Sequence, residues 1–341
     1  MEHHPTPSSA AVGVIGLGEI GQVHVTGVRR VQAARLVAVA DTEPTLLRPF
    51  EADGIRVYQD AGELIDDPQV GTVSVCLPHN LHFPVASQAI RAGKNVLVEK
   101  PLAIGLPDCE ALVSAATDAG VALGVSHNQV FYGPHAEAKR LIDSGGIGKP
   151  VLIRLRLGMG PAWGGWRDSP ALAGGGLLMD AGMHRLYLAL YFFGPVRRVR
   201  AVLDAPMQEG ETFAVAILEF QAGALGIIEA NHHGPPGTFD DEIEIVGSDA
   251  TLRLGGIESL SFGYRTGPAL TMFRDRRWSE LPLPADDWET SVHASVAAYL
   301  DAVIANREPP VTGAAALETM RLLHEIYDSA VILGEKARRP G

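Results

Sequence analysis

The stretch from residue 12 to residue 41 constrains the fold of this chain more than any other. An apolar run at 12–15 leads into a glycine turn at 16–21, and a helical pattern follows to about Arg30. A second apolar run at 36–40 ends at Asp41, twenty residues beyond Gly21. Strand, glycine turn, helix and strand in this order predict the start of a doubly wound parallel sheet.

The glycine turn predicts a dinucleotide-binding site. Gly16 permits the tight turn, Gly18 lets the backbone approach a pyrophosphate, and Gly21 lets the helix pack closely. An acid at the position of Asp41 binds the ribose hydroxyls of NAD and repels the 2′-phosphate of NADP, so we expect NAD. The alternative for Asp41 is a turn residue at a strand end. The expected cofactor-binding turn consists of Gly16, Leu17, Gly18, Glu19, Ile20 and Gly21.

Further strands are expected at 72–76, 95–98 and 122–125, with helices between them. Ligands of doubly wound sheets lie beyond the carboxyl ends of the strands, so the residues that follow each strand are candidates for cofactor contact. They are Leu77, Pro78, His79, Asn80 and His82, then Glu99 and Lys100, then Asn128. For His82, capping of the following helix stays open, and for Asn128 a turn role does.

Lys100 is the candidate with the most specific chemical role. An ammonium group beside a nicotinamide can hydrogen-bond a substrate oxygen and stabilise the charge that develops on it. The alternative is an exposed lysine at a strand end.

A second candidate stretch begins with three glycines at 174–176 and continues as an apolar segment that carries Asp180 and His184. We expect the glycines to open a helix, on which a spacing of four residues places the acid and the imidazole on one face. Tyr187 shares that face. The alternative is an acid that satisfies free backbone amides, with His184 as a core residue.

The rest of the second half predicts an α+β domain. A segment at 159–173 with Trp163, Trp166 and Arg167 is expected to be a loop, in which a tryptophan can stack on a sugar or simply pack. Arg167 can contact a phosphate or pair with an acid. Five β-rich runs between 199 and 254 predict an open, mainly antiparallel sheet. Helical patterns cover 134–142, 290–305 and 314–333.

Length and composition bound the class of protein. The 341 residues, 46% hydrophobic and 20% charged, fit two globular domains, which we place at 11–126 and 127–336 after a disordered tail at 1–10. The net charge of −12, without a basic stripe, argues against a nucleic-acid partner. The absence of an apolar run of about 18 residues argues against a membrane span.

The sequence predicts a cytoplasmic protein, since it shows no signal-peptide pattern. Two cysteines are too few for a disulfide framework. No metal site is expected, because no metal-ligand spacing accompanies His232 and His233.

Taken together, the motifs resemble those of the Gfo/Idh/MocA oxidoreductases, over nearly the whole stretch from Val12 to about Gly334. The resemblance is carried by the turn at 16–21, Pro-His-Asn-Leu-His at 78–82, Glu-Lys-Pro at 99–101, and GGGLLMDAGMH at 174–184. It implies that Lys100, Asp180 and His184 are catalytic, that NAD or NADP is the cofactor, and that the second domain's sheet forms a homodimer or homotetramer. Many family members that oxidise inositols have an acid where this chain has Tyr187.

The expected reaction is reversible hydride transfer between a nicotinamide and a secondary alcohol or ketone of a small sugar, cyclitol or related polyol. His184 would be the general base, Asp180 would orient it, and Lys100 would hold the reacting oxygen. Expected substrate contacts are Lys100, Trp166, Arg167, Asp180, His184 and Tyr187. Two alternatives stay open: a glycosidase that works by transient oxidation and elimination with NAD, and a non-catalytic NAD-binding protein.

Overall fold

The computed structural model describes residues 9–160, 164–257 and 267–334. The chain divides into two compact units: unit 1 comprises residues 1–128 and 289–320, and unit 2 comprises residues 129–288 and 321–341. The segment 289–320, which the sequence placed in the second domain, thus belongs to unit 1. Ala10, expected in the N-terminal tail, already pairs with Ala34 in the first strand pair.

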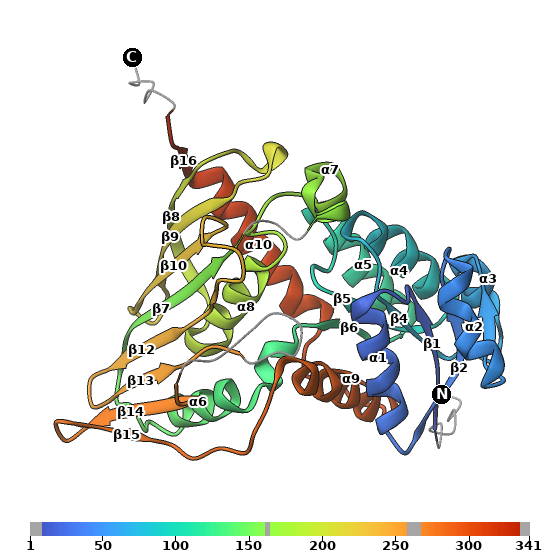
Figure 1. Cartoon of the computed structure of the whole chain (residues 1–341), viewed down its shortest axis with the longest axis horizontal. Helices are drawn as coiled ribbons and strands as arrows, with labels where there is room; N and C mark the ends of the chain where they lie inside the picture. The colour runs from blue at the N-terminus through green and yellow to red at the C-terminus, as the bar shows by residue number, and fades with distance from the viewer. Residues whose placement is uncertain (1–8, 161–163, 258–266, 335–341) are drawn as a thin grey trace. The chain divides into compact units, whose positions relative to one another are not determined.

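Unit 1 is built on a six-stranded parallel sheet in the order β3-β2-β1-β4-β5-β6, which confirms the doubly wound fold. Helices cover both faces of this sheet (Figure 1), so the central strands are buried on both sides. The strands are β1 (Ala10–Ile15), β2 (Ala34–Ala40), β3 (Arg56–Tyr58), β4 (Thr72–Val75), β5 (Asn95–Glu99) and β6 (Leu123–Ser126).

Capping residues mark the ends of several helices of unit 1. The carboxylate of Asp60 accepts the first free N–H groups of α3, and Gly120 ends α5 in the left-handed conformation. The helices are α1 (Glu19–Arg30), α2 (Pro44–Ala52), α3 (Ala61–Asp66), η1 (His79–Leu81), α4 (His82–Arg91), α5 (Leu106–Ala119), nearly all of α9 (Trp288–Ile304), and the start of α10 (Gly313–Ser329).

Packing explains why α9 belongs to unit 1. Its residues Val296, Tyr299 and Leu300 are buried in the same core cluster as Val14 of β1 and Val25 of α1. The Tyr299 hydroxyl also donates to the carbonyl oxygen of Ala122, at 3.1 Å.

Unit 2 contains a large sheet in the order β15-β14-β13-β12-β7-β10-β9-β8-β16, with β11 paired to β7. All pairs are antiparallel except β7–β10 and β8–β16, which confirms the expected open, mainly antiparallel sheet. The strands are β7 (Pro150–Met159), β8 (Val196–Leu203), β9 (Phe213–Phe220), β10 (Leu225–Asn231), β11 (Phe239–Asp240), β12 (Ile243–Gly247), β13 (Thr251–Leu254), β14 (Leu270–Arg274), β15 (Arg277–Glu280) and β16 (Ala330–Ile332).

Helices of unit 2 pack on one face of this sheet, as Figure 1 shows for α6 and α8. The opposite face carries alternating exposed residues, such as Arg154, Ile217 and Leu225. The helical elements are η2 (Asn128–Phe131), α6 (Gly133–Asp143), η3 (Gly165–Asp168), α7 (Pro170–Ala173), α8 (Gly182–Phe193) and η4 (Met207–Glu209), with the end of α10.

Two features of unit 2 differ from the expectation. The last helix ends at Ser329 rather than near Leu333, because Ala330–Ile332 pair with β8 as a strand. The β14–β15 hairpin was not predicted, since all four residues of β15 are exposed and give no alternating pattern. Among the described residues, no helix is both long and apolar enough to cross a bilayer.

Candidate active site

The glycine turn between β1 and α1 combines two crowded positions with one open position. Gly16 has a φ of 86°, and a Cβ there would collide with the carbonyl oxygen of Cys76. A Cβ at Gly21 would collide with the carbonyl oxygen of Gly16, whereas one at Gly18 would meet nothing within 4 Å. The fold therefore requires glycine at 16 and 21, and leaves open space in front of Gly18.

Asp41, at the end of β2, holds this turn in place. One carboxylate oxygen accepts the N–H of Leu17 at 2.6 Å, and the other accepts the N–H of Glu43 at 2.9 Å. The turn role considered for Asp41 is thus present. Each carboxylate oxygen has a second lone pair for a further donor, so the contacts are compatible with a ribose hydroxyl.

The start of α1 fits the phosphate part of a dinucleotide. Glu19 and Ile20 form the first turn of α1, and its N-cap, Gly18, provides no side-chain hydrogen bond to that turn. Free N–H groups at a helix start, reached through the open space at Gly18, form a site suited to an anion.

The His82 ring lies between the segments that follow β4 and β5. Its ring is fully buried, with Nδ1 2.6 Å from the carbonyl oxygen of Pro101 and Nε2 2.8 Å from that of Leu77. Burial lowers the pKa of His82, so the neutral ring donates through one of these nitrogens. The helix-capping alternative for His82 is wrong: α4 begins at His82 itself, and the ring nitrogens face the carbonyl oxygens of Leu77 and Pro101 rather than N–H groups of α4.

The short turn η1 brings His79 and Asn80 beside this histidine. The rings of His79 and His82 meet edge to face, with centroids 5.6 Å apart. In the described part of the chain, the Oδ1 atom of Asn80 is buried without a hydrogen-bond partner. A buried acceptor of this kind is normally satisfied by a ligand or water, so Asn80 is compatible with a contact to a bound cofactor.

Glu99, at the end of β5, belongs to a buried charge network that the sequence did not predict. Its Oε1 atom lies 2.9 Å from Nε2 of His24, and Nδ1 of His24 lies 2.8 Å from the Ser74 hydroxyl. Burial alone lowers the pKa of His24, but Cys76 and Glu99 outweigh burial and raise it to about 10. The same contact lowers the pKa of Glu99 against the effect of its burial. The directions of the two pKa shifts favour an imidazolium paired with a carboxylate.

Lys100 follows directly, and Glu99 fixes its backbone. The Oε2 atom of Glu99 accepts the N–H of Lys100 at 3.1 Å, and the Lys100–Pro101 peptide bond is cis. The Lys100 side chain is half-buried at the carboxyl edge of the parallel sheet.

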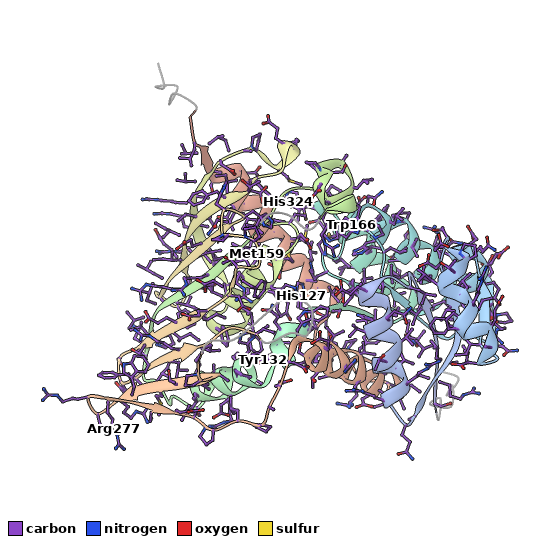
Figure 2. All side chains as sticks on the ribbon, viewed as in Figure 1. His127, Tyr132, Met159, Trp166, Arg277 and His324 are labelled. Carbon is purple, nitrogen blue, oxygen red and sulfur yellow. The ribbon has the colours of Figure 1, made fainter. Side chains whose placement is uncertain are left out.

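His127, labelled in Figure 2, and Asn128 directly follow the end of β6. The buried amide of Asn128 donates to the Ser291 hydroxyl of α9 at 2.7 Å. Burial lowers the pKa of His127 to about 3, so that ring is neutral. Asn128 therefore has a structural partner, and its contact with a cofactor stays a prediction.

In unit 2, the glycine-led stretch is not the helix that its sequence suggested. Residues 174–181 form turns, and α8 begins only at Gly182. Glu211 binds three consecutive backbone N–H groups of this stretch: its carboxylate accepts those of Gly176 and Leu178, and its carbonyl oxygen accepts that of Leu177. Asp180 thus precedes the helix, and His184 lies in its first turn, so the two do not share a helical face.

Asp180 is paired with Arg167. The Nε atom of Arg167 lies 3.1 Å from Oδ2 of Asp180, and its guanidinium carbon lies 4.5 Å from the ring centroid of Trp166. Trp166, labelled in Figure 2, lies in η3 between β7 and α7. Of the two roles considered for Arg167, pairing with an acid is present in the structure. Trp163 lies outside the described residues.

Tyr187 and its neighbour Arg185 are buried in α8. Burial raises the pKa of Tyr187 to about 12, so the phenol is neutral at physiological pH. Arg185, which sequence reasoning missed, is fully buried, donates to the carbonyl oxygen of Asp241 at 2.8 Å, and also contacts Gln129. The local sequence could not predict the partners of Arg185, because Asp241 and Gln129 each lie 56 residues away along the chain.

Comparisons with known proteins place the geometry in context. A family model described as "Oxidoreductase family, NAD-binding Rossmann fold" (GFO/IDH/MocA) matches residues 10–127, and a GFO/IDH/MocA C-terminal domain model matches residues 135–253. The chain is 32% identical over 254 residues to myo-inositol 2-dehydrogenase of Thermotoga maritima, which covers 71% of this chain and 74% of that protein. It is 30% identical over 271 residues to scyllo-inositol 2-dehydrogenase (NAD(+)) of Bacillus subtilis, with 75% of each covered.

Among solved structures, an NAD binding oxidoreductase from Klebsiella pneumoniae has a TM-score of 0.82 and 26% sequence identity. The match covers 94% of this chain and 96% of that one.

The glycine turn gives a first prediction. Gly18→Ala should leave the free energy of unfolding within about 0.5 kcal/mol of wild type, because a Cβ there meets open space. It should weaken NAD⁺ binding by about tenfold or more, because the Cβ occupies the approach of the pyrophosphate. Gly21→Ala should destabilise by about 1–3 kcal/mol through its clash. Calorimetry and chemical denaturation measure both effects, and unchanged NAD⁺ affinity in Gly18→Ala would contradict the assignment.

The buried pair gives a second prediction. His24→Ala leaves the Glu99 carboxylate buried without its cation, which should cost about 3–5 kcal/mol in the free energy of unfolding. His24→Ala combined with Glu99→Gln removes the uncompensated charge and should recover part of that loss. Urea denaturation followed by circular dichroism on these two variants and on Glu99→Gln alone gives the coupling free energy, and equal losses in His24→Ala and the double variant would show that the pair is not ionised.

Proposed function

Because this chain belongs to the Gfo/Idh/MocA family of oxidoreductases and carries its NAD-binding Rossmann domain, we propose that it oxidises or reduces a small sugar, cyclitol or related polyol. The reacting group is a secondary alcohol, or the corresponding ketone. The observation that carries this proposal is the half-buried Lys100, fixed by Glu99 at the sheet edge where Gly18 leaves space for a dinucleotide.

In unit 1, the cofactor-binding residues are those of the turn at 16–21 and Asp41, the strand-end residues Leu77, Pro78, His79, Asn80 and His82, and Glu99, Lys100 and Asn128. NAD supplies the hydride acceptor or donor at C4 of its nicotinamide. The ammonium of Lys100 donates a hydrogen bond to the substrate oxygen that alternates between hydroxyl and carbonyl, and stabilises the negative charge on it.

In unit 2, His184 is the general base that removes the hydroxyl proton during oxidation and returns it during reduction. An imidazole titrates near neutral pH, and a positioned base contributes roughly 10²- to 10⁴-fold in rate. Asp180 orients this base, and Arg167 holds Asp180. Trp166, Arg167 and Tyr187 are the further substrate contacts that we propose.

The relatives support a cyclitol or sugar as the substrate. Two of them are named inositol dehydrogenases, and one of these is named with NAD(+). Tyr187 offers a neutral phenol where many inositol-oxidising members have an acid, so sugars and deoxysugars belong in any substrate test beside inositols. NAD rather than NADP fits the carboxylate of Asp41 at the end of β2.

We also propose a cytoplasmic homodimer or homotetramer. Cys76 and Cys109 are buried free thiols, which suits a reducing compartment. The open face of the unit 2 sheet exposes Ile217 and Leu225 on neighbouring strands, with 45% and 47% of each residue accessible. These exposed aliphatic side chains, among charged residues such as Arg154, suit contact with a second copy of the chain.

The direct test is NADH absorbance at saturating NAD⁺ against a panel of cyclitols, aldoses and deoxysugars. A substrate that reduces NAD⁺ in a stoichiometric reaction supports the proposal. Release of an aglycone from a glycoside without net NADH would instead indicate the glycosidase reaction, and NAD⁺ binding without turnover of any of these would contradict an enzymatic role.

Two substitutions test the assigned roles. His184→Ala should lower kcat by about 10²- to 10⁴-fold through the loss of the base. Lys100→Met should lower kcat by about 10²-fold or more through the loss of charge stabilisation, while NAD⁺ still binds. Steady-state kinetics and NAD⁺ titration measure these effects; wild-type kcat in either variant would remove that residue from the site.

The proposed assembly gives a separate prediction. Ile217→Lys places a charge on the exposed sheet face and should shift the protein toward the monomer without changing its circular dichroism. Thr26→Lys, which adds the same charge to an exposed position of α1, is the control. Sedimentation velocity reports the mass, and an unchanged oligomer in Ile217→Lys would exclude this face as the interface.

A further inference from the structure

Glu211 is a buried carboxylate for which the proposed reaction has no direct use. It lies between η4 and β9 with none of its surface exposed. Its Oε1 atom accepts the N–H of Leu178 at 2.7 Å, and its Oε2 atom accepts the N–H of Gly176 at 3.1 Å. The hydroxyl of Tyr327, on α10, lies 3.0 Å and 2.9 Å from these two oxygens.

The contact with Glu211 extends along three consecutive residues. Leu177, between the two amides bound by the carboxylate, donates its N–H to the carbonyl oxygen of Glu211 at 2.9 Å. A Cβ at Gly176 would collide with the backbone of Glu211, and a Cβ at Gly175 would lie 2.9 Å from the Tyr327 hydroxyl. The glycines of this stretch thus let the chain press against Glu211 and Tyr327.

The residues held by Glu211 in turn support the proposed catalytic groups. The N–H of Asp180 bonds to the carbonyl oxygen of Gly176 at 3.3 Å. The N–H of Gly182, the first residue of α8, bonds to the carbonyl oxygen of Leu177 at 2.8 Å. His184 follows in that first turn. The positions of Asp180 and His184 therefore depend on residues that Glu211 fixes.

The donors around Glu211 suit an ionised carboxylate. The side-chain contacts described above are all N–H or O–H groups, and a carboxylate with a proton would place one more hydrogen among them. Burial raises the pKa of Glu211 to about 7 in spite of these donors. A glutamine would fit worse than the carboxylate, because its amide group is itself a donor.

We propose that Glu211 is a positioning residue, which fixes the loop at 174–181 and the start of α8 so that Asp180 and His184 stand in their reactive arrangement. This inference rests on the proposed function, because it requires those two residues to take part in the reaction. A displacement of about 1 Å in a catalytic group can cost on the order of 10²-fold in rate.

The test compares Glu211→Gln with Glu209→Gln, which makes the same change at an exposed position of η4. Hydrogen exchange should show faster exchange at residues 176–178 in Glu211→Gln, with unchanged exchange in β9 and β10. We expect kcat to fall by about 10- to 100-fold and the Kd of NAD⁺ to stay unchanged. Glu209→Gln should match wild type in every measurement.

Two further variants separate positioning from a general loss of structure. Glu211→Asp keeps the charge on a shorter side chain and should restore part of kcat. Tyr327→Phe removes one donor and keeps both backbone contacts, so its loss of kcat should be smaller than that of Glu211→Gln. Should Glu211→Gln fail to fold, these two variants and their exchange at 176–178 decide the question in the same way.

Two outcomes would overturn the inference: protection at 176–178 that survives in Glu211→Gln, or faster exchange there with a wild-type kcat. A failure of the proposed function appears differently, because Asp180→Ala and His184→Ala would then keep wild-type kcat whatever Glu211 does.

Discussion

A buried carboxylate can hold a loop by accepting its backbone N–H groups only if something compensates the cost of burying the charge. Glu99 and Glu211 meet this condition by different means. Glu99 accepts the N–H of Lys100 and is balanced by the imidazolium of His24. Glu211 accepts the N–H groups of Gly176 and Leu178, and the further donor to it is the neutral hydroxyl of Tyr327. The loops proposed to carry the chemistry depend on these two groups.

The two environments shift the pKa of the buried carboxylate in opposite directions. The charge on His24 lowers the pKa of Glu99, so that carboxylate stays ionised well below neutral pH. Without a cation beside it, Glu211 has a pKa that burial raises to about 7 in spite of its donors. The support of Lys100 is therefore insensitive to physiological changes in pH. Glu211, which supports Asp180, has a pKa close to physiological pH.

The local sequence predicted those parts of the fold that local periodicity controls. The apolar runs gave five of the six strands of the parallel sheet, all except β3, and the glycine turn gave the start of α1. The chain at 174–181 was wrongly expected to be a regular helix: its first N–H groups bond to Glu211, 35 residues from Gly176, and the N–H of Gly182 bonds five residues back to Leu177. A tertiary acceptor of this kind leaves no trace in the spacing of nearby residues.

The residues that hold the candidate site in place could not be predicted from the sequence for the same reason. His24 and Glu99 are 75 residues apart, and the strand order of the sheet brings them together. The sequence did offer one signal: His24 lies on the buried stripe of α1 with Gly21, Val25 and Val28, where a titratable group needs a partner. Lys100, Asp180 and His184 could be selected because the chemistry of their side chains is visible in the sequence, whereas their supports resemble ordinary core or turn residues.

Burial separates the groups proposed to react from the groups that hold them. Lys100, Asp180 and His184 are half-buried, whereas His24, Glu99 and Glu211 are buried. A reacting side chain must stay accessible to its substrate, so it cannot be fixed by complete burial of its own surface. Its geometry has to come from neighbours that are fixed, because precise placement depends on a rigid supporting layer. In this protein that layer consists largely of carboxylates bonded to backbone N–H groups, which fix the main chain and leave the reactive side chain to meet its substrate.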